Sequence, residues 1–356
     1  MSGKTFMVMA GGTGGHIFPA LAVARALQAR GQHVIWLGSE DSMETRIVPQ
    51  YDILLETLAI KGVRGNGLMR KLMLPFTLFK TVNAAKQIIK KHRVSCVIGF
   101  GGFVTFPGGL AAKALGIPIV IHEQNAVAGL SNKKLSKWAT RVLYAFPKAF
   151  DAPNGLVGNP VRAEIAQLPV PEQRFAERTG ALKVLVVGGS LGAQVLNELV
   201  PAALALLPAA QRPQVRHQAG RDKLQALQAQ YQQQGVEAEC TEFIDDMVSA
   251  YRDADLVICR AGALTIAELT AAGLGALLVP YPHAVDDHQT ANARFMVQAD
   301  AGLLLPQSQL TAEKLAEILA SLDRERCLAW ATQARTLAMP DSADRVAEIA
   351  IQTTSI

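Results

Sequence analysis

The stretch MVMAGGTGGHIFP, residues 7–19, reads as a short apolar strand, a glycine-rich turn and the start of a helix. We expect that helix to run from about Pro19 to Arg30. Glycines let the chain turn through positive φ angles at little steric cost, and they leave the backbone N–H groups open to a ligand. The positive end of the helix dipole adds to this effect. The stretch therefore predicts an α/β fold whose first turn accepts an anionic or polar ligand.

The turn departs from two common nucleotide-binding motifs. Ile17 stands where the dinucleotide fingerprint needs its third glycine, and no Gly-Lys-Ser/Thr sequence follows to make a P-loop. This disfavours a nicotinamide-dependent oxidoreductase. His16 lies where the loop becomes helix, and there the helix dipole favours the neutral imidazole, which can act as a base.

The composition describes a well-filled globular protein. The chain has 356 residues, of which 50% are hydrophobic and 18% charged, so we expect two domains. The formal charge of +5 is mildly basic, but the lysines and arginines are spread along the chain, which disfavours nucleic acid as a partner. Four scattered cysteines without a CxxC pair indicate a reducing compartment and argue against zinc. The apolar runs are too short for a secretory signal or a membrane span, so we expect a soluble or peripheral protein.

Further strands and polar loops follow in the first half. Residues 33–38, 53–60, 94–99 and 117–121 read as strands. A second glycine loop, residues 101–109, follows the third of these, and the sequence His122-Glu123-Gln124-Asn125 follows the fourth. Open α/β sheets bind ligands at the carboxyl ends of their strands, so these polar residues are binding candidates. The alternative is that they only cap the next turn.

The second half repeats the opening plan. A Pro- and Gly-rich segment, residues 151–183, marks the boundary, and Val184–Ala193 then gives strand, glycine turn and helix again. The alternation of strands and helices in both halves predicts two parallel-sheet domains. A second helix start, Arg260–Glu268, offers amides to a diphosphate and places a carboxylate, Glu268, for two ribose hydroxyls. On spacing alone, a glutamate that only balances the helix dipole is equally compatible.

Three charged residues bear on whether the site needs a metal ion. Asp253 and Asp255 could suggest a metal site, but they fall at a helix end that leads into a buried strand, so we reject it. Without a metal, a leaving diphosphate needs helix ends, Ser190 and a cation, for which Arg162 is the candidate. The alternative for Arg162 is a plain salt bridge in the hinge.

Residues 68–80 form a densely apolar segment that we expect to be a helix kinked or started at Pro75. Two interpretations remain open for it, a core helix and an interfacial patch that inserts apolar side chains among lipid acyl chains. The patch would consist of apolar residues flanked by basic ones: Leu72, Met73, Phe76 and Phe79 with Arg70, Lys71 and Lys80.

Nearly the whole chain resembles the MurG family, through the two glycine loops, the polar segments and the two later helix starts. The matching segments, in order along the chain, are Gly11–His16, Gly101–Gly109, His122–Asn125, Gly158–Arg162, Gly188–Gly192, Arg260–Glu268 and Asp286–Asn292. One departure is Phe103, where some relatives have tyrosine, so any hydroxyl role there is absent.

The resemblance implies a GT-B glycosyltransferase, with two Rossmann-like domains whose parallel sheets face each other across a cleft. Residues 1–160 would bind the lipid-linked acceptor and associate with the membrane, residues 161–340 would bind the UDP-sugar donor, and the helix of residues 341–356 would pack back on the first domain. The implied reaction moves N-acetylglucosamine from UDP-N-acetylglucosamine to lipid I at the cytoplasmic face of the bacterial inner membrane. It implies peptidoglycan synthesis without a cofactor or a metal.

The resemblance also implies the residues of the site. The expected donor-site residues are Thr13, Gly14, Gly15, Asn125, Arg162, Ser190, Ile244, Ala263, Leu264, Thr265, Ile266, Ala267, Glu268 and Gln289. The Ile244 backbone would meet the uracil, Glu268 the ribose and Gln289 the sugar hydroxyls. The reaction would be a single inverting displacement with His16 as the base.

Three alternatives stay open at this point. The base could be a carboxylate such as Glu123, with His16 a structural cap or a ligand of the acceptor's diphosphate. A UDP-N-acetylglucosamine epimerase of the same fold would use the same donor but would need neither a lipid acceptor nor an apolar basic patch. A pure binding module is disfavoured by the two glycine loops that face substrate.

Overall fold

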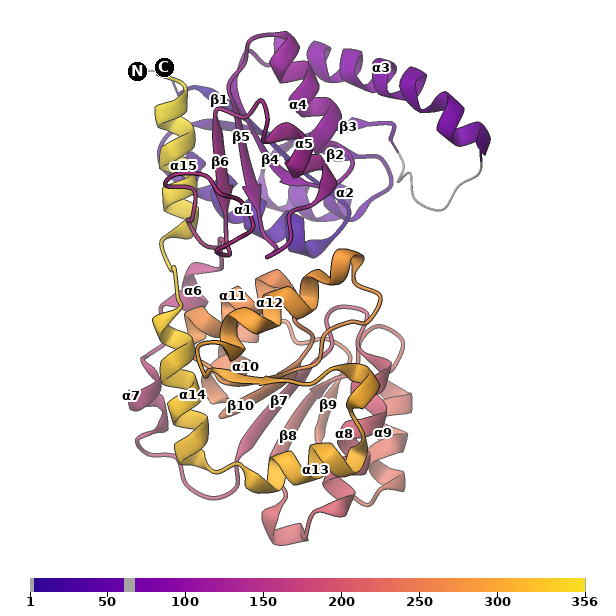
Figure 1. Ribbon diagram of the computed structural model, residues 1–356, viewed down its shortest axis with the longest axis vertical. Helices are drawn as coiled ribbons and strands as arrows, with labels where there is room; N and C mark the ends of the chain where they lie inside the picture. The colour runs from indigo at the N-terminus through magenta and orange to yellow at the C-terminus, as the bar shows by residue number, and fades with distance from the viewer. Residues whose placement is uncertain (1–2, 61–67, 356) are drawn as a thin grey trace. The chain divides into compact units, whose positions relative to one another are not determined.

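The chain folds into two compact units, Met1–Val161 with Met339–Ile356, and Arg162–Ala338. The computed structural model describes residues 3–60 and 68–355, except for the side chains of residues 68–75 and 285. Each unit contains a six-stranded sheet in which the paired strands run parallel, with helices between them (Figure 1). The two parallel-sheet domains predicted from the sequence are therefore confirmed.

The sheet of the first unit has the strand order β3-β2-β1-β4-β5-β6. Its central strand β1 pairs with both β2 and β4, so the chain reverses its direction of winding there. Such a switch point creates a crevice at the carboxyl ends of the strands, where α/β proteins bind ligands. The strands are β1 (Thr5–Ala10), β2 (His33–Ser39), β3 (Leu54–Leu58), β4 (Val94–Gly101), β5 (Ile119–Glu123) and β6 (Arg141–Tyr144).

Both faces of this sheet are covered, because successive side chains of β1 enter two different cores. Phe6 and Val8 pack with α1 and α15, whereas Met7 and Met9 pack with α3, α4 and α5. The helix α15 at the C-terminal end of the chain thus completes the core of the N-terminal unit (Figure 1). The helices are α1 (Gly14–Ala29), α2 (Met43–Ile47), η1 (Val48–Tyr51), α3 (Leu68–Lys91), α4 (Thr105–Ala114), α5 (Leu130–Leu135) and α15 (Ser342–Thr353).

The first helix begins earlier than the sequence predicted. Thr13 is extended, and its carbonyl accepts the N–H groups of His16 and Ile17 at 3.1 Å each, so the helix starts at Gly14. The expected start at Pro19 is wrong, and Pro19 lies inside α1. His16 consequently belongs to the first turn of the helix.

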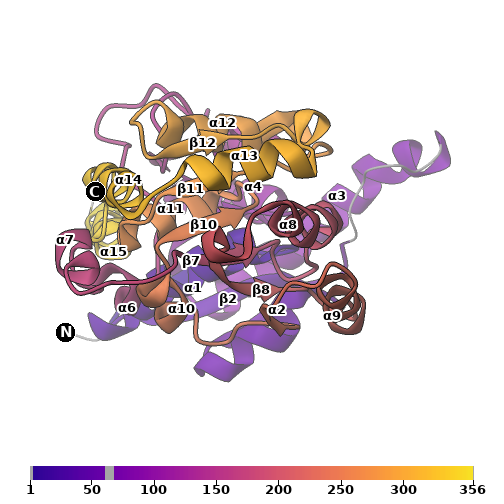
Figure 2. The same ribbon diagram turned by 90° about the horizontal axis from the view of Figure 1, so that it is seen from below.

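The second unit repeats the topology, with the strand order β12-β11-β10-β7-β8-β9. In Figure 2 the labels of β12, β11, β10, β7 and β8 follow this order, with α8, α9 and α13 on one side and α10, α11 and α14 on the other. The strands are β7 (Lys183–Val187), β8 (Gln214–Gln218), β9 (Glu239–Thr241), β10 (Leu256–Cys259), β11 (Ala276–Leu278) and β12 (Gly302–Leu304).

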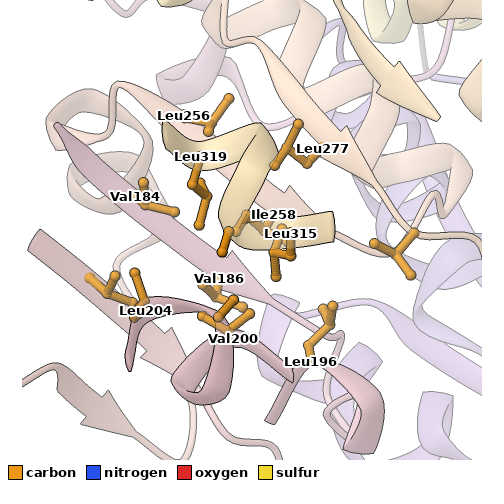
Figure 3. Close-up of a cluster of buried hydrophobic side chains, with 14 of the residues drawn as sticks. Val184, Val186, Leu196, Val200, Leu204, Leu256, Ile258, Leu277, Leu315 and Leu319 are labelled. Carbon is orange, nitrogen blue, oxygen red and sulfur yellow. The ribbon is translucent and has the colours of Figure 1, made fainter. Parts of the chain in front are cut away.

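The core of this unit lies between the central strands and α8 and α13. Figure 3 shows Val184 and Val186 of β7 beside side chains of α8, β10 and α13. The helices are α6 (Ala163–Ala166), α7 (Pro171–Phe175), α8 (Gln194–Leu206), η2 (Ala209–Gln211), α9 (Leu224–Gln233), α10 (Met247–Asp253), α11 (Ala263–Ala272), η3 (Val285–Asp287), α12 (His288–Val297), η4 (Gln307–Gln309), α13 (Ala312–Ser321) and α14 (Arg324–Thr336).

The apolar segment around Pro75 lies within the long helix α3, which runs from Leu68 to Lys91. Because α3 continues through Pro75, the helix does not start at this proline, and the alternative of a kink there stays a prediction. Across residues 3–60 and 68–355, no helix combines the length and the apolar character that crossing a bilayer requires.

Candidate active site

The first glycine loop joins β1 to α1 at the switch point of the first sheet. Thr13 and Gly15 are exposed, and Gly14 and His16 are partly buried. Since α1 begins at Gly14, the N–H groups of Gly14 and Gly15 belong to its first turn, where backbone amides have no partner within the helix. The loop and the helix dipole together favour an anionic or polar ligand, as the sequence indicated.

The second glycine loop packs directly against the first. Gly101 and Gly102 have φ angles of 114° and 88°, in the left-handed region that favours glycine. A Cβ at Gly101 would lie 2.9 Å from His16 Nε2, and one at Gly102 would lie 2.5 Å from Gly11 O. Both positions therefore need glycine for close approach as well as for backbone conformation.

The imidazole of His16 is oriented by the backbone of its own loop. Its Nδ1 lies 3.2 Å from the carbonyl oxygen of Gly11. A carbonyl oxygen can only accept, so Nδ1 carries the proton in this bond. The nitrogen that gains or loses a proton is consequently Nε2, which faces Gly101.

The polar segment after β5 is organised around Glu123, whose side chain is almost fully buried. Its Oε1 accepts the Asn125 N–H at 3.0 Å, and its Oε2 accepts the Gly129 N–H at 3.0 Å and Asn132 Nδ2 at 2.9 Å. A carboxylate engaged in this way fixes the loop and is poorly placed to take a proton from a substrate. This favours His16 over Glu123 as the base. The bond to Glu123 also fixes the position of Asn125 within this loop.

His122 has a structural place in the same segment. Its Nε2 donates to the Gly158 carbonyl at 2.8 Å, and its Nδ1 accepts from Gln124 Nε2 at 3.0 Å. The ring is fully buried, and burial lowers the pKa of His122 from 6.5 to about 4. A neutral histidine with both nitrogens bonded in this way holds the loop to the segment that follows β6.

Acidification is expected to destabilise the first unit through His122. The unfolded chain binds a proton as the pH falls below 6.5, whereas the folded unit does so only near pH 4. The contribution of this ring is therefore complete above pH 6.5 and is lost as the pH falls toward 4. At pH 5 the expected loss in the free energy of unfolding is about 2 kcal/mol.

The variant His122→Gln isolates this contribution, because glutamine keeps an N–H donor for Gly158 and does not titrate. Urea denaturation of both proteins at pH 7.5 and pH 5 gives the free energies of unfolding. The wild type should lose about 2 kcal/mol more than the variant between the two pH values. An equal loss in both proteins would mean that His122 does not carry this pH dependence.

In the second unit, Ser190 lies in the glycine turn between β7 and α8. The turn has positive φ angles at Gly189 (86°) and Gly192 (68°), and a Cβ at Gly192 would lie 2.0 Å from Ala219 O. Because α8 begins only at Gln194, Ser190 belongs to the turn itself, where it is exposed. The turn is thus a compact loop with one hydroxyl and several backbone amides, a suitable cradle for phosphate.

The backbone of Ile244 is already engaged on one side. Its N–H donates to Gln218 Oε1 at 3.1 Å, and the residue is almost fully buried. If the Ile244 backbone contacts a uracil, it would therefore use its carbonyl oxygen, or its N–H would have to leave Gln218. The sequence did not identify Gln218, which ends β8 and reaches back to the Gly189 carbonyl at 3.0 Å through its Nε2.

The predicted run from Ala263 to Glu268 forms the first one and a half turns of α11. Gly262 is the extended residue before it, so the first-turn amides of Ala263, Leu264 and Thr265 start the helix. Ile266 and Ala267 complete the turn, and Ile266 is fully buried. The first turn of α11 is therefore the second group of backbone amides in this unit, after the glycine turn with Ser190.

Glu268 and Arg162 form an ion pair, although the sequence gave them separate roles. Arg162 Nη2 donates to Glu268 Oε1 at 2.9 Å, and the Tyr251 hydroxyl donates to Oε2 at 3.0 Å. Burial raises the pKa of Glu268, and the bonds from Arg162 and Tyr251 oppose that shift. Burial likewise raises the pKa of Tyr251 well above its ordinary value, so its hydroxyl stays a donor. The local sequence gave no signal for Tyr251.

Gln289 lies at the start of α12, where its Oε1 accepts the Tyr281 N–H at 2.9 Å. Asn292, one turn further along, is buried, and its Nδ2 donates to the Ala261 carbonyl at 3.1 Å. Asn292 therefore connects α12 to the loop before α11. Gln289 is partly buried, and its bond to Tyr281 holds its side chain to the loop that follows β11.

The two aspartates rejected as a metal site are used within the protein. The carboxylate of Asp255 is fully buried and pairs with Arg178 and Arg324, while Asp253 pairs with Arg252. Within the part of the chain that the structure describes, no group of three or more His, Cys, Asp or Glu side chains is placed to hold a metal ion.

Sequence comparison assigns both units to one glycosyltransferase family. The profile "Glycosyltransferase family 28 N-terminal domain" matches residues 6–144, and "Glycosyltransferase family 28 C-terminal domain" matches residues 183–346. A relative from Neisseria meningitidis serogroup A is 80% identical over 351 residues, covering 99% of each chain. A relative from Cupriavidus metallidurans is 54% identical over 353 residues, again covering 99% of each. Both are named UDP-N-acetylglucosamine–N-acetylmuramyl-(pentapeptide) pyrophosphoryl-undecaprenol N-acetylglucosamine transferase.

Solved structures agree with this assignment. The crystal structure of Acinetobacter baumannii MurG superposes with a TM-score of 0.88 at 43% identity, covering 98% of this chain and 99% of that one. The calicheamicin glycosyltransferase CalG4 shares the GT-B fold alone, with a TM-score of 0.68 at 17% identity and 99% coverage of both chains. With both family 28 domains present and full-length relatives up to 80% identical, the chain belongs to the MurG family of glycosyltransferases.

Proposed function

We propose that this enzyme transfers N-acetylglucosamine from UDP-N-acetylglucosamine to the 4-hydroxyl of the N-acetylmuramyl-pentapeptide of undecaprenyl-linked lipid I, forming lipid II. The observation that carries this proposal is the 80% identity, over 99% of both chains, to a relative whose name states this transfer. The candidate site residues, from Thr13 to Gln289, lie in loops after strands and near the starts of helices, which supports the proposal.

The second unit supplies the groups that would hold the donor. The glycine turn with Ser190 and the first turn of α11 offer backbone amides and hydroxyls to a diphosphate, and Arg162 adds a positive charge. Glu268 would accept the ribose hydroxyls, Ile244 would meet the uracil, and Gln289 would contact the sugar. We propose that these groups neutralise the departing UDP without a divalent ion.

The first unit would supply the base for a single displacement. The acceptor 4-hydroxyl oxygen attacks the anomeric carbon while the bond from that carbon to the phosphate oxygen breaks, so the anomeric configuration inverts. The hydroxyl proton passes to His16 Nε2, because Nδ1 is already committed to the Gly11 carbonyl. Thr13, Gly14, Gly15 and Asn125 would contact the donor from this unit.

Radiolabel transfer from UDP-N-acetylglucosamine to a lipid I analogue in the presence of a chelator tests the function. The expected result is a labelled lipid product at an undiminished rate. Strict dependence on manganese would contradict the metal-free neutralisation. Conversion of the nucleotide sugar to its epimer without acceptor would contradict the transfer; the names of the relatives do not favour the epimerase alternative.

We further propose that α3 attaches the enzyme to the anionic surface of the inner membrane, at its cytoplasmic face. Phe76 and Phe79 are 66% and 67% exposed, which supports an interfacial patch rather than a core helix. Lys80 beside them is also exposed. The side chains of Arg70, Lys71, Leu72 and Met73, which belong to the same proposed patch, lie outside the described part of the chain.

Replacing the two exposed phenylalanines is expected to weaken membrane binding. The double variant Phe76→Ser/Phe79→Ser should partition to vesicles containing anionic lipid about 10-fold less than the wild type, because its apolar insertion is lost. Vesicle sedimentation measures the bound fraction. The matched control is Leu206→Ser, which removes a 55% exposed side chain of the second unit and should bind as the wild type does. Equal binding of all three proteins would remove α3 from the membrane contact.

A further inference from the structure

A buried carboxylate lies beneath the first glycine loop. Glu44 of the short helix α2 is fully buried, and both of its oxygens accept backbone N–H groups. Oε2 accepts from Gly12 at 3.1 Å, and Oε1 accepts from Ser39 at 2.8 Å. Burial of such a group is costly unless its oxygens are hydrogen-bonded, so its position needs an explanation.

Two glycines make room for this carboxylate. A Cβ at Gly11 would lie 2.3 Å from Glu44 Oε1, and one at Gly38 would lie 2.7 Å from Glu44 Cγ. Neither residue has a positive φ angle, so backbone conformation does not require glycine at these places. Glycine is required at both positions because a larger side chain would occupy the space of the Glu44 side chain.

The peptide between Gly11 and Gly12 connects Glu44 to His16. Its N–H, on Gly12, donates to Glu44 Oε2, and its C=O, on Gly11, accepts from His16 Nδ1 at 3.2 Å. The N–H and C=O of a trans peptide point in opposite directions, so the three groups form a chain of hydrogen bonds in series. A carboxylate is thereby linked to an imidazole through one peptide unit.

Hydrogen bonds in series polarise one another. An acceptor at the N–H draws electron density toward the carbonyl oxygen, which makes that oxygen a stronger acceptor for the imidazole N–H. A stronger acceptor at Nδ1 holds the tautomer that leaves Nε2 to take a proton, and it stabilises the imidazolium that forms. Serine-protease triads obtain the same effect from an aspartate that bonds the histidine directly.

We propose that Glu44 is a positioning residue for the transfer reaction, acting through the Gly11–Gly12 peptide to fix the His16 tautomer and orientation. The proposal rests on the proposed function, in which His16 is the base. A glutamate that only ties the loop to the end of β2 is the competing explanation, and the bond from Ser39 fits either one.

The test compares Glu44→Gln with a control that loosens the end of β1, directly before the same loop, without removing a charge. Trp36→Phe is this control, because it removes the bond from Trp36 Nε1 to the Ala10 carbonyl at 2.9 Å. Glutamine has one acceptor oxygen where Glu44 uses two, so Glu44→Asp, which keeps the carboxylate, is made in parallel. Thermal unfolding identifies variants that fold.

We expect Glu44→Gln to lower kcat by about 10- to 100-fold with KM for the UDP-sugar changed less than about two-fold. Glu44→Asp should keep more of kcat than Glu44→Gln, and Trp36→Phe should keep most of it. In a His16→Ala background, Glu44→Gln should have no further effect on kcat, because its influence passes through the imidazole. A full additional loss in that background, or equal losses in Glu44→Gln and Trp36→Phe, would overturn the proposal.

Nitrogen-15 NMR of histidine-labelled enzyme gives a readout independent of turnover and of the variants' folding. In the neutral ring of wild-type His16, the proton should reside on Nδ1, and Glu44→Gln should increase the share on Nε2. A wild-type ring protonated on Nε2 would refute the relay even if all variants failed to fold. Should His16→Ala retain activity, the base assignment would fail, while the NMR result would still decide whether Glu44 sets the tautomer.

Discussion

Replacing His16 with alanine is expected to lower kcat for lipid II formation by about 10³-fold, in the middle of the range for loss of a general base. The affinity for UDP should change by less than about two-fold, because the donor's nucleotide would be held by the second unit. Only the imidazole would be lost, since the first turn of α1 is formed by backbone N–H groups that donate to the Thr13 carbonyl.

Steady-state kinetics with a lipid I analogue and calorimetric titration with UDP separate the two effects. The matched control is His33→Ala, which removes an exposed histidine at the start of β2 in the same unit. Added imidazole should restore part of the turnover of His16→Ala and none in the control. If His16→Ala instead weakened UDP binding with kcat intact, His16 would be a ligand of the nucleotide and another group would be the base.

Local patterns in the sequence were sufficient to predict the two sheets. An apolar run that ends in a glycine turn predicts a strand followed by a turn in either half of the chain. Both units also wind their strands in the same order. In the first unit, the strand that was not predicted, β6, has four residues and lies at a sheet edge, where the apolar signal is short. The misplaced start of α1 has a related cause, because a glycine-rich first turn looks like loop in the sequence.

The sequence offered candidate site residues but not the side chains that bond to them. Thr13 and Ser190 could be proposed because they lie in the turns after β1 and β7, and Glu268 because it lies near the start of the helix after β10. Their partners come from distant segments: Tyr251 lies 17 residues from Glu268, Arg162 lies 106 residues away, and Glu44 is 32 residues from Gly12. Such pairs are set by the packing of whole elements, which a single sequence does not reveal.

Replacing Glu268 with glutamine is expected to weaken UDP-N-acetylglucosamine binding by about 100-fold or more. Each hydrogen bond between a carboxylate and a ribose hydroxyl contributes about 1.5–3 kcal/mol, and two such bonds are proposed. The carboxylate can make them without releasing its present partners. It has about four lone-pair positions, and Arg162 and Tyr251 occupy two of them.

A nucleotide lacking one hydroxyl distinguishes ribose recognition from a general loss of the donor site. The wild type should bind UDP about 10-fold or more tightly than 2′-deoxy-UDP, and Glu268→Gln should bind the two with nearly equal affinity. The control Glu313→Gln, which alters an exposed carboxylate at the start of α13, should retain the wild-type preference. If Glu268→Gln weakened both nucleotides equally, Glu268 would act by holding Arg162 toward the diphosphate. The side chain of Arg162 is 45% exposed, so it can pair with Glu268 and still present N–H groups to a phosphate.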